Sequence, residues 1–183
     1  VIEEEPADTS KSEEEEKPKK AEPKKDKDSK PSLVIYDISS KEKTIFPEVT
    51  KHSLSYSANY CIFHSRGDST FESGAYIWNS TTKQAEPLDI ELKGIDKIAT
   101  DTFENQFALL STLQETKDKE KFYALHHFNF GQLSPEKSLD SNDLRLRSDV
   151  SNNAPFYYTK DGRRLFFGIY QKRAKHKEDS TLL

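Results

Sequence analysis

The side chains most able to do chemistry are few in this sequence and widely spaced. It contains five histidines and one cysteine. His126 and His127 are adjacent on an expected strand, where successive side chains point to opposite faces, so they cannot chelate one metal ion together. His52, His64 and His176 are isolated, without a cysteine or a spaced acidic partner. Because no metal-ligand spacing is present, we expect neither a metal site nor another cofactor.

A catalytic nucleophile is not indicated either. The chain has no Gly-x-Ser-x-Gly segment, the motif that places a reactive serine on a tight turn between a strand and a helix. Cys61 lies in the apolar run YCIF, which favours a small buried core side chain over a reactive thiol. We therefore predict no catalytic residue within these 183 residues.

Two adjacent arginines remain as weak candidates for a binding role. Arg163 and Arg164 follow a Lys-Asp-Gly turn in the stretch YYTKDGRRLFF, from Tyr157 to Phe167. In one interpretation they face a channel and bind the carboxylate of a peptide; in the other they are solvated charges on a turn. The sequence leaves both interpretations open.

The same stretch indicates the elements that must position these residues. Asp-Gly between two apolar runs is a strong hairpin signal, because the turn needs backbone angles that glycine adopts easily. Three segments pair a short strand with a longer apolar strand across a tight turn, at residues 52–65, 96–111 and 154–168. Their turns coincide when Cys61, Phe107 and Leu165 are placed in register, with spacings of 46 and 58 residues. Spacings of this size indicate repeated supersecondary units.

A second kind of hairpin precedes or separates these segments, at residues 33–49, 75–90 and 121–139. Each has an apolar strand with an aromatic residue, a polar turn and a weaker outgoing strand. Two adjacent hairpins form a four-stranded antiparallel unit, the blade of a β-propeller. We therefore predict an all-β fold, an incomplete β-propeller built from such blades. A β-sandwich has similar short strands and remains the alternative.

The composition divides the chain into two parts. Residues 1–32 contain 8 Lys, 11 Asp or Glu and no aromatic residue, which predicts a disordered charged linker or inserted loop. Residues 33–183 form the predicted propeller fragment, of about two full blades with flanking half blades. The absence of methionine suggests a piece of a longer protein. The balance of charges argues against nucleic-acid binding, and no apolar run is long enough for a membrane span.

The hairpin copies, of which YTKDGRRLFFG is the clearest, resemble those of propellers in the TolB and prolyl oligopeptidase families. The charged insertion, followed by SLVIYDISSKEKTIFPEVTKHSLS and later by NNAPFYYTKDGRRLFFGIYQKRAKHKEDSTLL, is similar to one group in particular. This is the N-terminal propeller region of large prolyl oligopeptidase-like serine peptidases from Bacteroidetes-type bacteria. The resemblance extends from about Leu33 to Leu183, and the first two hairpin copies lack the Asp-Gly.

The resemblance implies a parent chain with a propeller and an α/β-hydrolase domain that carries a Ser, Asp and His triad. The propeller would then gate or orient peptide substrates, so the expected partners are a peptide and the hydrolase domain of the same chain. It also suggests a periplasmic or exported protein. The alternative function is a TolB-like or WD-type propeller that binds protein partners and has no peptidase activity, since one fold hosts both roles.

Overall fold

The computed structural model describes residues 31–115, 121–140 and 148–171. Regular structure in these ranges consists of β-strands joined by turns, and no described segment forms a helix that could cross a bilayer. The predicted disordered segment lies almost wholly outside the described residues, so its state and its boundary at residue 32 stay predictions.

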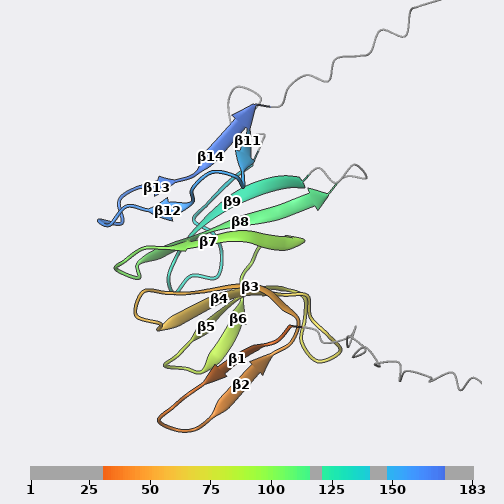
Figure 1. Ribbon diagram of the computed structural model, residues 1–183, viewed down its shortest axis with the longest axis vertical. Coiled ribbons are helices and arrows are strands. Elements are labelled where there is room, and N and C mark those ends of the chain that lie inside the picture. Colours follow the sequence, from red (N-terminus) through yellow and green to blue (C-terminus); the bar gives the residue numbers. More distant parts are fainter. Residues whose placement is uncertain (1–30, 116–120, 141–147, 172–183) are drawn as a thin grey trace, which may run out of the picture.

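Two four-stranded antiparallel sheets form the centre of the molecule (Figure 1). In both, strands that follow one another in the chain pair side by side, which is the arrangement of a propeller blade. The first sheet contains β3 (Val49–Leu54), β4 (Tyr60–Ser65), β5 (Gly74–Asn79) and β6 (Gln84–Pro87). The second contains β7 (Gly94–Thr100), β8 (Gln106–Glu115), β9 (Lys121–Asn129) and β10 (Lys137–Leu139).

Shorter hairpins flank the two sheets, and each sheet is itself made of two of the predicted hairpins. On one side, β1 (Leu33–Tyr36) pairs with β2 (Lys43–Phe46). On the other side, one longer hairpin is divided into two paired parts, β11 with β14 and β12 with β13. These strands are β11 (Ser148–Ser151), β12 (Tyr157–Tyr158), β13 (Leu165–Phe166) and β14 (Gly168–Gln171). All six hairpins expected from the sequence are present.

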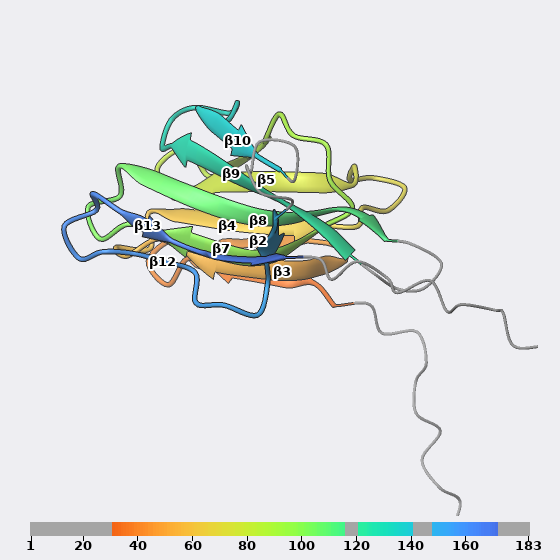
Figure 2. The same ribbon diagram turned by 90° about the horizontal axis from the view of Figure 1, so that it is seen from above.

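The four units stack in chain order (Figure 1), and Figure 2 shows their strands lying over one another when the molecule is turned by 90°. Strand β7 contacts both β3 and β12, so the first strands of successive units lie together. In a propeller these are the innermost strands, next to the central axis. The predicted all-β propeller is therefore confirmed, whereas a sandwich would not bring equivalent first strands together in succession.

Sheets stack in this way because the second strand of each blade is apolar on both faces. In β4, Cys61 and Phe63 point to one side and Ile62 to the other, and all three are fully buried. In β8, Phe107 and Ala108 are likewise buried on opposite sides. A strand with two apolar faces must be covered by a neighbouring sheet on each side.

Three separate hydrophobic clusters result, one at each boundary between stacked units. The cluster between β1–β2 and the first sheet is centred on Phe46, Phe63, Tyr76 and Trp78. The cluster between the two sheets contains Phe107 and Phe128, whose rings stack with centroids 4.8 Å apart. The third, between the second sheet and the last hairpin, includes Ala108, Leu110, Leu125 and Val150. The prediction that Cys61 is a core side chain is confirmed, and burial raises the pKa of its thiol to about 11.

The last hairpin is less regular than its sequence suggests. Residues 152–156 bulge between β11 and β12, while residues 165–171 continue almost without interruption on the other side. The bulge passes close to Gly168: a Cβ atom on this glycine would lie only 2.1 Å from the Cβ of Ala154. The backbone can approach here because Gly168 has no side chain.

We predict that Gly168→Ala destabilises the protein by about 1–3 kcal/mol, because the new methyl group forces the bulge away from its strand. The matched control is Gly94→Ala. Gly94 also lies in a strand, and a Cβ there would meet nothing within 4 Å. Urea unfolding of both variants measures the difference, and equal midpoints would contradict the close approach.

Candidate functional site

The hairpin turns of successive units have the same backbone arrangement. In the turn after β3, Ala58 N donates to Ser55 O and Ser55 N to Tyr60 O. The turns after β7 and β12 repeat both hydrogen bonds, starting from Asp101 and Thr159. The register that aligned Cys61, Phe107 and Leu165 therefore identified three equivalent turns correctly.

A left-handed residue recurs at the same place in each of these turns. Ala58, Glu104 and Gly162 have φ angles of 59°, 56° and 67°. Each lies three positions before the residue used for the register. Glycine adopts this conformation at little cost, whereas alanine and glutamate are strained in it. This explains why only the third copy, which has the Asp-Gly, is obvious in the sequence.

A side-chain oxygen at the first turn position accepts backbone N–H groups in all three copies. Ser55 Oγ accepts from Tyr60 N at 3.0 Å, and Thr159 Oγ1 accepts from Arg164 N at 3.2 Å. Asp101 is 1% exposed, and its Oδ1 accepts from the backbone of Asn105 and Gln106 at 2.9 and 3.1 Å. Three residue types thus perform one role, since each has an oxygen at the distance needed.

Neighbouring turns are also bonded to one another. Glu104 Oε1 accepts from Ser57 N at 2.6 Å, and its Oε2 accepts from Asn59 Nδ2 at 2.9 Å. On its other side, the second turn reaches the third through the hydrogen bond from Gln106 Nε2 to Gly162 O. The three turns therefore form one connected surface, which we call the turn face (residues 55–59, 101–105 and 159–164).

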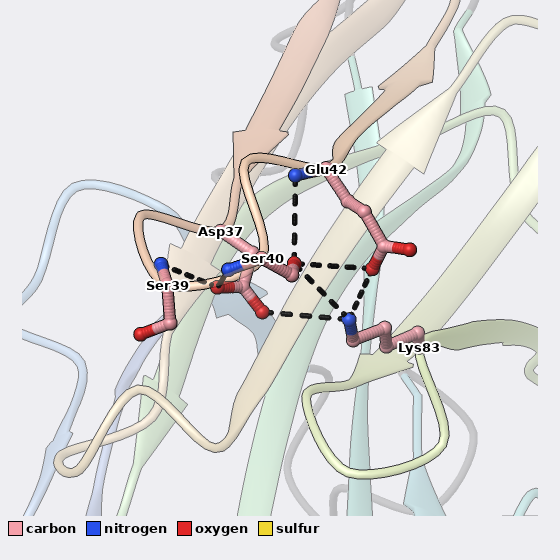
Figure 3. A network of polar contacts seen from close by, with 5 residues as sticks. All are labelled: Asp37, Ser39, Ser40, Glu42 and Lys83. Atoms are coloured by element: carbon pink, nitrogen blue, oxygen red, sulfur yellow. Dashed lines mark hydrogen bonds and ion pairs between the residues drawn. The ribbon is translucent and has the colours of Figure 1, made fainter.

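An ionic network joins two turns of the second kind of hairpin (Figure 3). Lys83, in the β5–β6 turn, binds Glu42 and lies 3.5 Å from Asp37 Oδ2 in the β1–β2 turn. Asp37 Oδ1 accepts from the backbone N–H groups of Ser40 and Ser39, which lower the pKa of Asp37. The network is largely exposed, so it fixes the relative position of the turns more than it stabilises the fold.

Arg163 and Arg164 lie on the turn face, at its third turn, and both are exposed. Their backbones are held in the turn: Arg163 N donates to Asp161 Oδ1, and Arg164 N donates to Thr159 Oγ1. In the described part of the chain, neither guanidinium lies within 4 Å of a carboxylate. They are thus accessible to a ligand, and their proposed role in binding a peptide stays a prediction.

A second candidate surface lies on the innermost strands and was not identified from the sequence. A hollow of about 300 Å³ lies beside β3 and β7, lined by Lys51, His52, Ser53, Lys97, Ile98 and Phe156. Lys97 Nζ donates to Ala154 O at 2.6 Å, which ties β7 to the bulge of the last hairpin. Lys51 and Lys97 are separated by the same 46 residues that relate Cys61 to Phe107. This spacing is the signal in the sequence that could have identified the two lysines as an equivalent pair.

The two adjacent histidines make separate contacts, as their alternation on β9 predicts. His126 is 7% exposed, with Nε2 2.9 Å from Ser111 Oγ and Nδ1 2.8 Å from Ser138 Oγ, and burial lowers its pKa. His127 instead contacts Gln106 and Glu136. Among the described residues, no three His, Cys, Asp or Glu side chains lie together as a metal site.

Comparison with known proteins adds little to this picture. No protein-family model matches the chain, and no curated protein matches it significantly. Among solved structures, the chain is similar to "the beta-propeller domain of the Trilobed protease from Pyrococcus furiosus", with a TM-score of 0.47 and 11% sequence identity. The match covers 66% of this chain and 36% of that one. The propeller architecture follows from the chain's own strand order and stacking.

The contact of Glu104 with the first turn leads to a pH-dependent prediction. Burial alone would raise the pKa of Glu104, but hydrogen bonds from Ser55, Asn59 and Ser57 outweigh it and lower the pKa. A lowered pKa in the folded state adds stability above the unfolded-state value of about 4.3, and this is lost as the pH falls through the folded-state value.

We therefore expect Glu104→Gln to lower the free energy of unfolding at pH 7 by at most about 1 kcal/mol, since the turn is partly solvated. The loss should shrink as the pH falls through the range where Glu104 is protonated. Urea unfolding across pH measures it, with Glu86→Gln as a control on an exposed strand position. A loss that does not change with pH would contradict an ionised Glu104 as the cause.

Proposed function

We propose that this chain is the non-catalytic propeller segment of a prolyl oligopeptidase-like serine peptidase, in which it gates or orients peptide substrates. The peptidase context comes from the sequence resemblance of the hairpin copies. The observation that carries the gating role is the pair of lysines at equivalent positions of two innermost strands, Lys51 on β3 and Lys97 on β7, beside one hollow.

The chemistry of this surface suits a peptide that ends in a carboxylate. Lys51 is exposed, and in the described part of the chain neither lysine lies within 4 Å of a carboxylate. Phe156, from the last hairpin, adds an apolar contact to the same hollow. Cations along the inner wall would draw an anionic chain end toward the axis by long-range attraction. The hydrolysis itself belongs to the hydrolase domain that the resemblance implies.

The peptidase context is tested on the full-length parent protein. We expect a serine-directed phosphonate to label it covalently and to abolish cleavage of short peptides, whereas the 183-residue chain alone is neither labelled nor active. Mass spectrometry of the labelled protein identifies the modified serine. A parent protein that stays unlabelled would overturn the proposal.

The gating role is tested separately, in the full-length protein with Lys51→Gln. We expect kcat/KM for a peptide with a free C-terminal carboxylate to fall about two- to fivefold, while the amidated peptide is cleaved as before. This corresponds to at most about 1 kcal/mol for one exposed charge. Lys43→Gln, at an exposed position of β2, is the matched control. Equal effects on both peptides would show that Lys51 does not recognise the C-terminal carboxylate.

A second candidate function is a propeller that binds a protein partner and has no peptidase activity. Large apolar side chains on the two outer hairpins favour it: Val34, Tyr36 and Ile45 are half exposed, as are Tyr157 and Ile169. Such faces need either further blades or a partner to cover them. A stoichiometric partner recovered with a parent protein that has no nucleophile motif would select this function over the first.

A further inference from the structure

A second hollow, of about 220 Å³, lies between the two central sheets at the opposite end from the turn face. Strands β3 and β7 both end at the turn face, whereas Thr50 and Ile95, which line the hollow, lie near the starts of these strands. The strand that follows each of them adds a residue near its far end, His64 from β4 and Thr112 from β8. It is therefore built by two blades and is distinct from the hollow beside Lys51.

The lining of this hollow carries an excess of positive charge. Arg66, Lys93 and Lys121 all line it, and all three side chains are exposed. Asp96 is the single carboxylate among its lining residues. Across the described residues, no carboxylate oxygen lies within 4 Å of any of the three cationic groups. Three cations that converge without such a partner leave their charge available to an anion.

Buried polar groups form the inner wall of the hollow. His64 is 2% exposed, and its Nδ1 lies 2.6 Å from Thr50 Oγ1. When the Thr50 hydroxyl donates to Nδ1, the neutral ring carries its proton on Nε2, which makes no hydrogen bond within the described chain. Burial, with Arg66 nearby, lowers the pKa of His64 and favours this neutral ring. Thr112, 9% exposed, adds a further hydroxyl group.

We propose that this hollow is a binding site for a small oxyanion group, phosphate or carboxylate. Arg66, Lys93 and Lys121 supply charge-assisted donors at its rim, and His64 and Thr112 lie at its inner wall. A hollow of this size admits one such group with some water, and too little of the wall is apolar for a large hydrophobic ligand. The site depends only on the contact between the two blades, so it does not rest on the peptidase context.

The proposal is tested with the full chain by calorimetry and by NMR at low ionic strength. Three probes distinguish the sources of the oxyanion: inorganic phosphate, an N-acetylated dipeptide with a free carboxylate, and the amide of the same dipeptide. We expect saturable binding of phosphate, of the free-acid dipeptide or of both, none of the amide, and a shift of the His64 ring signals on titration. Binding should weaken as salt is added.

The triple variant R66Q/K93Q/K121Q should weaken this binding at least tenfold. The control K43Q/K137Q/K160Q removes the same amount of charge from exposed lysines elsewhere and should bind as the unaltered chain does. All three control lysines lie outside the lining of the hollow. Equal losses of affinity in both variants would attribute the effect to net charge and contradict a specific site. The proposal would also be overturned if the unaltered chain showed no saturable binding of phosphate or of the free acid.

Discussion

The whole arrangement depends on the second strand of each blade, whose two faces are both apolar. β4 presents Phe63 to one neighbour and Ile62 to the other, and β8 does the same with Leu110 and Leu109. At about 25 cal/mol per Å² of apolar surface, leaving either face in water would cost several kcal/mol per strand. Each sheet is therefore stable only between two others, and the stack brings the first strands together along one line.

That stacking also brings equivalent turns into contact, and the turns show what the sequence could predict. Hairpins, their order and the register of Cys61, Phe107 and Leu165 follow from local patterns, because strands and turns are specified by residues close in the chain. The side-chain oxygen at the first turn position was harder to recognise. Ser55, Asp101 and Thr159 are different residue types, yet each accepts the equivalent backbone hydrogen bond. Chemical equivalence can persist where residue identity does not.

The surfaces that could bind a ligand were largely beyond prediction. Arg163 and Arg164 were identified because they adjoin a recognisable turn, and they do lie exposed on the turn face. The hollow beside Lys51 and Lys97 and the one beside His64 each combine residues from different blades. Their geometry depends on how the sheets twist and how closely they stack, which no short stretch of sequence specifies. The close approach of Ala154 to Gly168 was also hidden, because it depends on the bulge at residues 152–156 within the last hairpin.

The two ends of the stack have different physical character. On the turn face, the acidic side chains accept hydrogen bonds from turn residues, as in the contacts of Glu104 and of Asp161. At the other end, Arg66, Lys93 and Lys121 converge on one hollow with a single lining carboxylate. Paired charges hold neighbouring turns together, whereas unpaired charges attract counterions or ligands. The acidic side chains of the turn face therefore bind turn residues, while its exposed cations, Lys160, Arg163 and Arg164, make no ion pair within the described residues.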